Sequence, residues 1–209
     1  MHKLVLLIGP ALFLVAELVL PAGSTDPATR VAIIMANSAA WEFGHQLILI
    51  AFAFLLLWLV GITGVARQSS PLLAGLGLWF SGFAVLANFG VGVLQLVALE
   101  LVQHGPEQQA RSVLQTLAAS SSLMTFVFLP YLGLVPGLAL LAIALTRRLH
   151  APWLGALLPL SAVLICIGGI VQLKALLIVG GVGVVLFTLG LIRQYPVEEA
   201  AVRQSTTSL

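Results

Sequence analysis

Long stretches without a charged side chain constrain this sequence more than any other feature. Residues 45–66 contain no Asp, Glu, Lys or Arg, and neither do residues 72–99. A helix needs about 20 mostly apolar residues to cross the hydrocarbon core of a bilayer, which is about 30 Å thick. Stretches of this length therefore predict membrane-spanning helices.

The composition excludes the main soluble classes. Hydrophobic residues make up 60% of the chain and charged residues 8%, and the mean hydropathy is +1.14. A soluble domain carries ~25% charged residues, so this chain cannot cover a globular surface with ionic groups. A cytosolic enzyme, a nucleic-acid-binding protein and a disordered chain are therefore excluded.

Six candidate spans follow when the sequence is divided at its charges. They cover residues 4–20, 45–66, 72–102, 124–146 and 153–193, the last stretch holding two spans with a tight turn near Gln172 and Lys174. We therefore predict an all-α fold, a polytopic transmembrane helical bundle of six spans. It forms a single domain over residues 1–195, with hairpins at 4–66, 72–146 and 153–193, followed by a polar cytoplasmic tail over residues 196–209.

The basic residues predict the orientation of the chain. If the N-terminus is inside, the cytoplasmic set is Lys3, Arg67, Arg147, Arg148, Arg193 and Arg203, and the external set is Arg30, Arg111 and Lys174. Basic residues favour the cytoplasmic side, so both termini are predicted to be cytoplasmic. Cleavage of the first span as a signal peptide stays open, although the large residue in Leu20-Pro21-Ala22 disfavours it.

Two external segments of the sequence are alike. A helix-compatible stretch follows both Pro27 and Pro106, and each leads into an apolar span that ends at Arg67 or Arg147. Proline is favoured in the first turn of a helix, and Asp26 can cap the first of these helices. Each hairpin is therefore predicted to carry a short amphipathic helix on its outer face. A duplicated unit and two independent hairpins both remain open.

Polar side chains recur at helical spacing inside the spans. Ser81, Asn88 and Gln95 are seven residues apart and so share one face of the third span. Ser161 and Gln172 mark a similar stripe in the fifth span. Such stripes favour close helix packing and interhelical hydrogen bonds, and the alternative is a polar cavity.

Ionisable residues near the outer ends of three spans predict a binding pocket. Glu17, His45 and Glu100 lie at a similar depth, and polar groups in hydrocarbon face protein, water or ligand because leaving them unpaired is costly. In this hypothesis Glu17 is the charge or proton site, and Asn88 and Gln95 orient the ligand. The candidate ligand-binding residues are Glu17, His45, Asn88, Gln95, Glu100 and Gln172.

The sequence holds no zinc-hydrolase motif, nucleophile elbow or phosphate-binding loop. We therefore expect a non-catalytic protein without a cofactor, either a small-ligand or lipid-binding module or a subunit of a membrane complex. Its expected partners are the lipid bilayer and a second copy or another membrane protein, and not nucleic acid. One alternative is a small secondary transporter acting as an oligomer, because Pro130 and Pro136 interrupt the fourth span. Another is a haem or metal redox protein with His45 and His104 as ligands.

Residues 4–67 have a characteristic organisation. The opening span ends in Glu17 and Pro21, an external helix follows from Pro27, and the next span opens with Gly44-His45. In this organisation the chain resembles small bacterial polytopic membrane proteins of uncharacterised function. The resemblance implies a bacterial cytoplasmic membrane, and it carries no activity or site residue.

Overall fold

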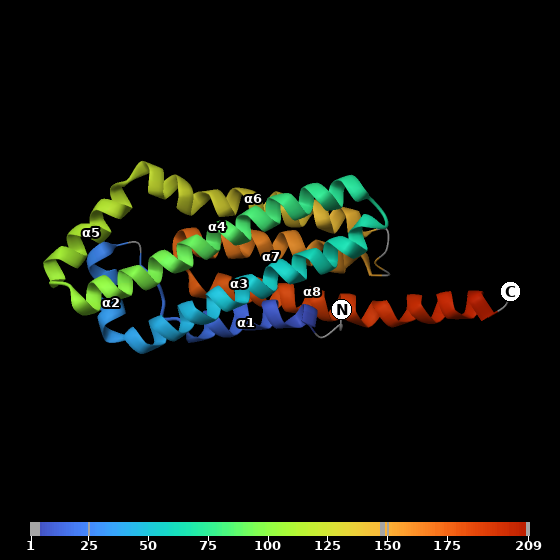
Figure 1. Cartoon of the computed structure of the whole chain (residues 1–209), viewed down its shortest axis with the longest axis horizontal. Coiled ribbons are helices and arrows are strands. Elements are labelled where there is room, and N and C mark those ends of the chain that lie inside the picture. Colours follow the sequence, from blue (N-terminus) through green and yellow to red (C-terminus); the bar gives the residue numbers. More distant parts are fainter. Residues whose placement is uncertain (1–4, 25, 147–148, 150, 208–209) are drawn as a thin grey trace.

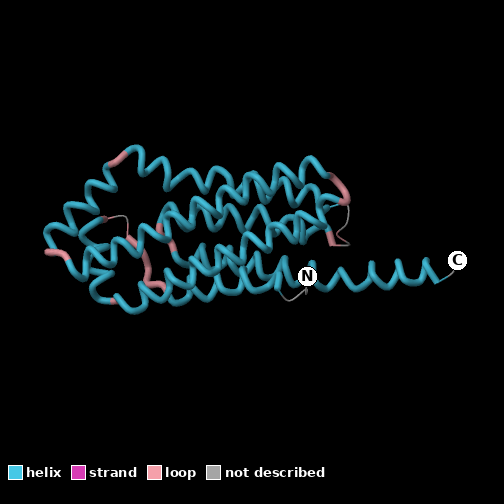
Figure 2. The backbone as a smooth tube through the Cα atoms, viewed as in Figure 1, coloured by secondary structure: helices cyan, strands magenta, loops and turns pink. Residues whose placement is uncertain are grey.

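A computed structural model describes residues 5–24, 26–146, 149 and 151–207. All regular secondary structure in these residues is α-helical (Figure 2), in agreement with the predicted all-α class. The helices in chain order are α1 (Val5–Val19), α2 (Pro27–Ala36), α3 (Ser38–Arg67), α4 (Pro71–His104), α5 (Glu107–Ala119), α6 (Ser121–Thr146), α7 (Pro152–Val171) and α8 (Lys174–Thr207).

Six of these helices form a closed ring. In chain order α1, α3, α4, α6, α7 and α8 each pack against the next, and α8 packs back against α1. The two shorter helices, α2 and α5, contact each other at one end of the bundle, and the end of α8 extends from the other (Figure 1). Each of the six ring helices is therefore a neighbour in space of the next ring helix along the chain, as is usual for consecutive elements.

Four helical segments in the described part of the chain are long and apolar enough to cross a membrane. They are Ser38–Arg67, Pro71–His104, Trp153–Val171 and Lys174–Gln194. The predicted spans 4–20 and 124–146 correspond to shorter apolar segments, Val5–Val19 and Pro130–Thr146. The structure therefore defines a helical membrane protein with at least four candidate spans.

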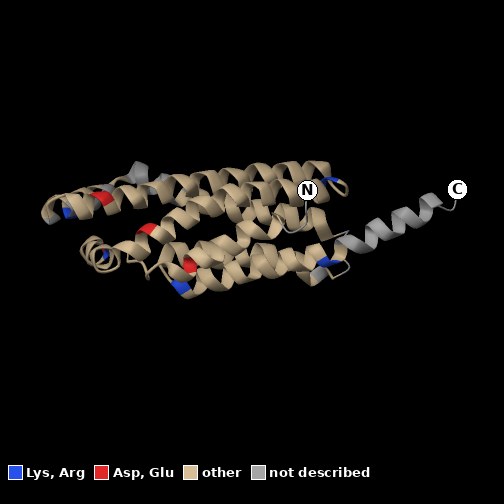
Figure 3. Ribbon diagram, turned by 60° about the horizontal axis from the view of Figure 1, so that its bottom comes forward, with Lys and Arg blue, Asp and Glu red and all other residues tan. Residues whose placement is uncertain are grey.

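The charge distribution and the outer surface fit this class. In Figure 3 the described Lys, Arg, Asp and Glu residues lie in the part of the bundle toward the short helices, some of them well inward, and at the opposite end, with an uncharged stretch between. Large apolar side chains point outward along the helices, among them Leu72, Trp79 and Leu132. Contiguous apolar surface on this scale is rare on a soluble monomer, and lipid is the solvent that covers it favourably.

The predicted turn between the last two spans is confirmed. Helix α7 ends at Val171, Gln172 adopts a left-handed conformation with φ of 54°, and α8 begins at Lys174. Helix α8 then runs on to Thr207, so the segment predicted as a polar tail continues the same helix. Helix α6 is likewise continuous through Pro130 and Pro136.

Both short helices predicted after Pro27 and Pro106 are present. The Asp26 carboxylate caps α2 by accepting hydrogen bonds of 2.7 Å from both the amide and the hydroxyl of Thr29, and these donors hold the pKa of Asp26 below its ordinary value. A single residue, Asn37 or Ser120, separates each short helix from the long helix that follows. The two segments therefore share a structural pattern as well as a spacing.

Helices α4 and α6 approach closely where both carry small residues. A methyl group at Gly77 of α4 would lie 2.9 Å from the carbonyl oxygen of Gly137 and 3.0 Å from the amide nitrogen of Leu141, both on α6. Ser81, one turn further along α4, is buried in the same crossing. Small residues permit this approach, so the first part of the predicted α4 stripe serves helix packing.

We expect Gly77→Ala to lower the free energy of unfolding by about 1–3 kcal/mol, because the new methyl group would overlap the α6 backbone. Gly82→Ala, on the same helix, is the matched control. Its methyl group would meet nothing within 4 Å, so it should be neutral or stabilise the helix by up to about 1 kcal/mol. Unfolding of both variants by denaturing detergent provides the measurement, and equal effects would contradict this view of the crossing.

Candidate functional site

A cavity of about 230 Å³ lies inside the ring of helices. Residues of α1, α3, α4, α6, α7 and α8 line it, and Arg30 of α2 reaches it at the end of the bundle that carries the short helices. An apolar cavity of about 150 Å³ is large enough to bind benzene. This cavity therefore has room for a small organic molecule.

The cavity is polar toward the α2 end and apolar toward the other. Its polar lining comes from the ends of helices near α2: Glu17, Arg30, His45, Gln95, Gln172 and Lys174. Asn88 and Tyr131 lie between the two parts. The deeper lining is formed by apolar residues that include Phe52, Leu55, Leu59, Leu138 and Val184. An amphiphile, with an apolar body and a polar head, matches this division.

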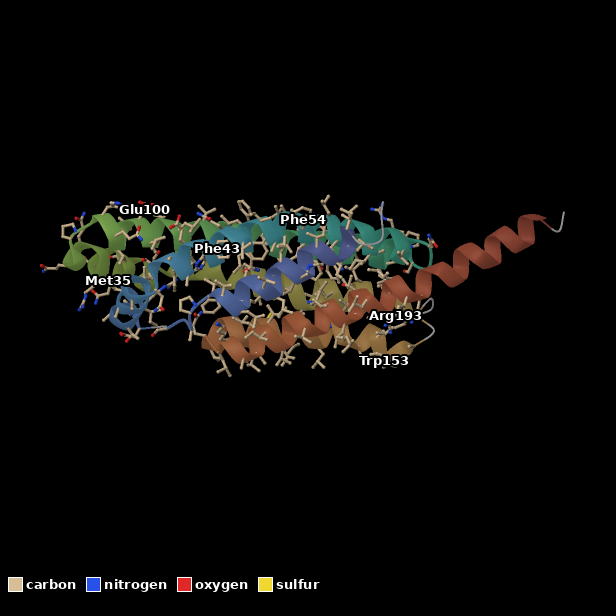
Figure 4. All side chains as sticks on the ribbon, turned by 90° about the horizontal axis from the view of Figure 1, so that it is seen from below. Met35, Phe43, Phe54, Glu100, Trp153 and Arg193 are labelled. Carbon is tan, nitrogen blue, oxygen red and sulfur yellow. The ribbon has the colours of Figure 1, made fainter. Side chains whose placement is uncertain are left out.

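Five of the six residues predicted for the pocket line this one cavity: Glu17, His45, Asn88, Gln95 and Gln172. Glu100 does not. Its side chain is 69% exposed near the end of α4 (Figure 4), and its carboxylate lies 3.1 Å from Nδ1 of His104, itself 74% exposed. The cavity therefore brings together residues from α1, α3, α4 and the turn between α7 and α8, and it leaves Glu100 on the outer surface.

Five lining residues with polar groups were not predicted as part of the pocket: Arg30, Trp41, Trp58, Tyr131 and Lys174. Arg30 and Trp41 connect α2, α3 and α4 over the polar end. The Arg30 guanidinium donates a hydrogen bond to Oε1 of Gln95 and lies 5.9 Å from the centre of the Trp41 ring. The Trp41 indole in turn donates to the backbone carbonyl of Gln95 at 3.2 Å.

Burial lowers the pKa of Arg30 from its ordinary value, although an arginine side chain keeps its charge in proteins. The amide oxygen of Gln95 and the face of the Trp41 ring both favour a cation. The charge of Arg30 is therefore stabilised by its neighbours before any ligand enters.

His45 presents one ring nitrogen to the cavity as an acceptor. Its Nδ1 lies 2.7 Å from the carbonyl oxygen of Trp41. A carbonyl cannot donate, so Nδ1 carries the hydrogen, and in the neutral ring Nε2 then holds a free lone pair. The His45 ring also packs on Trp41, with 4.7 Å between the ring centres, so its orientation is fixed from two sides.

Glu17 lines the cavity without a donor for its carboxylate. The residue is 7% exposed, and within the described residues it forms neither a hydrogen bond nor an ion pair. Lys174 acts on this carboxylate electrostatically, but its ammonium donates hydrogen bonds to the carbonyl oxygens of Leu18, at 3.0 Å, and Leu20. These carbonyls end α1, where a cation is favourable, so Lys174 serves the helix end.

A hydrogen bond across the ring closes the deep end of the cavity. The Trp58 indole of α3 donates to Oγ1 of Thr188 on α8 at 3.0 Å, and the Thr188 hydroxyl donates to the Val184 carbonyl at 2.8 Å. Trp58 also packs edge-on against Phe187, with 6.5 Å between ring centres. All of these side chains are buried, and beyond them the core is tightly packed.

Within the described part of the chain, no group of three or more His, Cys, Asp or Glu residues is placed to hold a metal ion. His45 and His104 occupy different surroundings, the first in the cavity and the second on the outer surface. Cys166 is buried, with its sulfur 3.8 Å from the Tyr131 carbonyl oxygen.

Comparisons of this chain with protein-family profiles, with curated proteins and with solved structures found no match. The chemistry of the candidate site is therefore argued from its own geometry.

We expect Thr188→Val to lower the free energy of unfolding by about 1 kcal/mol, because the Trp58 indole would lose its acceptor in a dry core. Valine has nearly the shape of threonine, so this substitution tests the contribution of the hydroxyl group alone. Thr188→Ser, which retains the acceptor, should recover part of the loss. A valine variant as stable as the parent, unfolded side by side in detergent, would contradict a sealing role for this bond.

Proposed function

We propose that this protein is a non-catalytic, six-span membrane protein that binds a small amphiphilic molecule. The pocket faces the outer side of a bacterial cytoplasmic membrane, and both termini are cytoplasmic. One observation supports binding above all. A single cavity gathers polar groups from several helices at one end and apolar side chains at the other, which is the form of a ligand pocket.

The packing of α1 and α6 supports a count of six spans. Both lie in the ring beside the four long apolar helices. Helix α6, with 26 residues, is about 39 Å long, enough to cross a bilayer, whereas α1 is about 22 Å long over its 15 described residues. Ile8, Val15 and Leu18 of α1 point outward as lipid-facing residues do.

The distribution of basic residues supports the orientation. Arg67 ends α3 and Arg193 lies where α8 leaves the bundle (Figure 4), whereas Arg30 lies on α2 and Lys174 begins α8 beside the end of α1. Together with the bias of basic residues toward the cytoplasm, this arrangement gives the cavity an external polar end. The pocket would then take its ligand from the periplasm or from the outer leaflet.

Fusions test this orientation. Green fluorescent protein fused after Arg67 should fluoresce, because it would remain in the cytoplasm. Alkaline phosphatase fused after Pro106 should be active, because it would reach the periplasm. The exchanged pair of fusions is the control and should be silent. Activity in the exchanged pair alone would invert the bundle and place the polar end of the cavity in the cytoplasm.

Tryptophan quenching tests binding in the cavity. Trp58 lies at the deep end and is 3% exposed, whereas Trp79 and Trp153 are 68% and 63% exposed on the lipid side. With both outer residues changed to Phe, only Trp41 and Trp58 remain, and both line the cavity. In nanodiscs of zwitterionic lipid, 10-bromodecan-1-ol should then quench the fluorescence saturably, because bromine quenches at short range.

Removal of Trp58 is the control for this experiment. In the same background Trp58→Phe should lose most of the saturable quenching, since Trp41 lies near the polar end. Quenching that rises linearly with probe and never saturates would show the probe in lipid alone, and binding in the cavity would be refuted.

A further inference from the structure

The polar end of the cavity holds two cations, and each of them hydrogen-bonds to a neighbouring helix. Arg30 donates to Gln95 and lies over Trp41. Lys174 donates to the two carbonyls that end α1. Arg30 joins α2 to α4, and Lys174 joins the start of α8 to the end of α1. Both cations therefore hold the helices together around the opening of the cavity.

The same end holds two acceptors that have no donor. The Glu17 carboxylate is 7% exposed and forms no hydrogen bond or ion pair among the described residues. Nε2 of His45 is left as an acceptor because Nδ1 donates to Trp41. Unmet acceptors in a buried site are costly, and a carboxylate most of all. A ligand that supplies donors removes this cost.

Aromatic side chains line the same cavity. Phe13, Trp41 and Tyr131 line the polar and middle parts of the cavity, and Phe52 lines its deeper, apolar part. The faces of aromatic rings attract a cation, more strongly when water is excluded. Unmet acceptors beside such rings favour a donor that is also positively charged.

From this combination, and resting on the proposed binding function, we propose that the ligand carries a primary ammonium head group. The ammonium would donate to Glu17 and to Nε2 of His45, and its apolar body would occupy the deep half of the cavity as far as Trp58. No proton is transferred in this binding step. The ammonium would form an ion pair with the Glu17 carboxylate, on which Lys174 already acts electrostatically.

A series of compounds with the same body and different heads tests this assignment. Decylammonium, decyltrimethylammonium, decanol and decanoate would compete with 10-bromodecan-1-ol for quenching in the nanodiscs described above, each at a matched concentration in the lipid. Decylammonium should compete roughly ten-fold better than decanol, because hydrogen bonds to a charged group are the stronger ones. Decyltrimethylammonium should compete less well, since it has the charge without an N–H donor.

Two carboxylates provide matched variants. Glu17→Gln should abolish the advantage of decylammonium over decanol while 10-bromodecan-1-ol still quenches saturably, which shows that the cavity is intact. Glu100→Gln removes an exposed carboxylate outside the cavity and should leave the advantage unchanged. His45→Phe keeps a ring and removes the acceptor, so it should reduce the advantage even if Glu17→Gln fails to fold.

The outcomes separate this inference from the binding function itself. Tightest binding of decanoate would assign the head group to Arg30 and overturn the ammonium site. Equal competition by all four compounds would also overturn it, since the cavity would then bind the alkyl body alone, and in both cases binding would stand. An absence of saturable quenching by 10-bromodecan-1-ol would remove the pocket and the inference together.

Discussion

The cost of an unpaired polar group in a medium without water governs this structure. Backbone N–H and C=O groups avoid that cost in helices, because a helix forms its backbone hydrogen bonds within one segment of the chain. Polar side chains avoid it by hydrogen bonding to one another or to backbone carbonyls, as Trp58 and Thr188 do inside the bundle, while large apolar side chains cover much of the outer surface. Some buried polar groups keep no partner among the described residues. The hydroxyls of Thr63, Ser69 and Ser81 lie outside the cavity lining, whereas the acceptors of Glu17 and His45 line the cavity, where a ligand could reach them.

One stripe on α4 shows how packing and cavity arise from the same pattern. Gly77 and Ser81 lie at the close crossing with α6, where a larger side chain would meet backbone. Asn88 and Gln95 continue the same face toward the α2 end and line the cavity. The residues on this face of α4 are thus small where α4 contacts α6, and they are amides where α4 lines the cavity. One part of α4 therefore serves helix packing and the next part lines the cavity, although the sequence alone presents these roles as alternatives.

The sequence was sufficient to predict the helices, the turn at Gln172 and most of the polar cavity lining, because each rests on local periodicity. Glu100 could have been separated from the pocket by the same means. It lies five residues after Gln95, which at 100° per residue is about 140° around the helix, whereas Asn88 and Gln95 differ by about 20°. Similar depth was therefore an insufficient criterion without the helix face.

Arg30, Trp41 and Lys174 could not be predicted in this way, since each acts through a contact with another helix. Lys174 directly follows a turn, where a solvated lysine is the ordinary expectation. Only the packing of α8 against α1 brings it to the carbonyls of Leu18 and Leu20. That contact joins the first helix of the ring to the last at the polar end. Trp58 and Thr188 join α3 to α8 at the deep end. The cavity is thus bounded at each end by polar contacts between distant segments, so its shape is fixed by closure of the ring and not by any one hairpin.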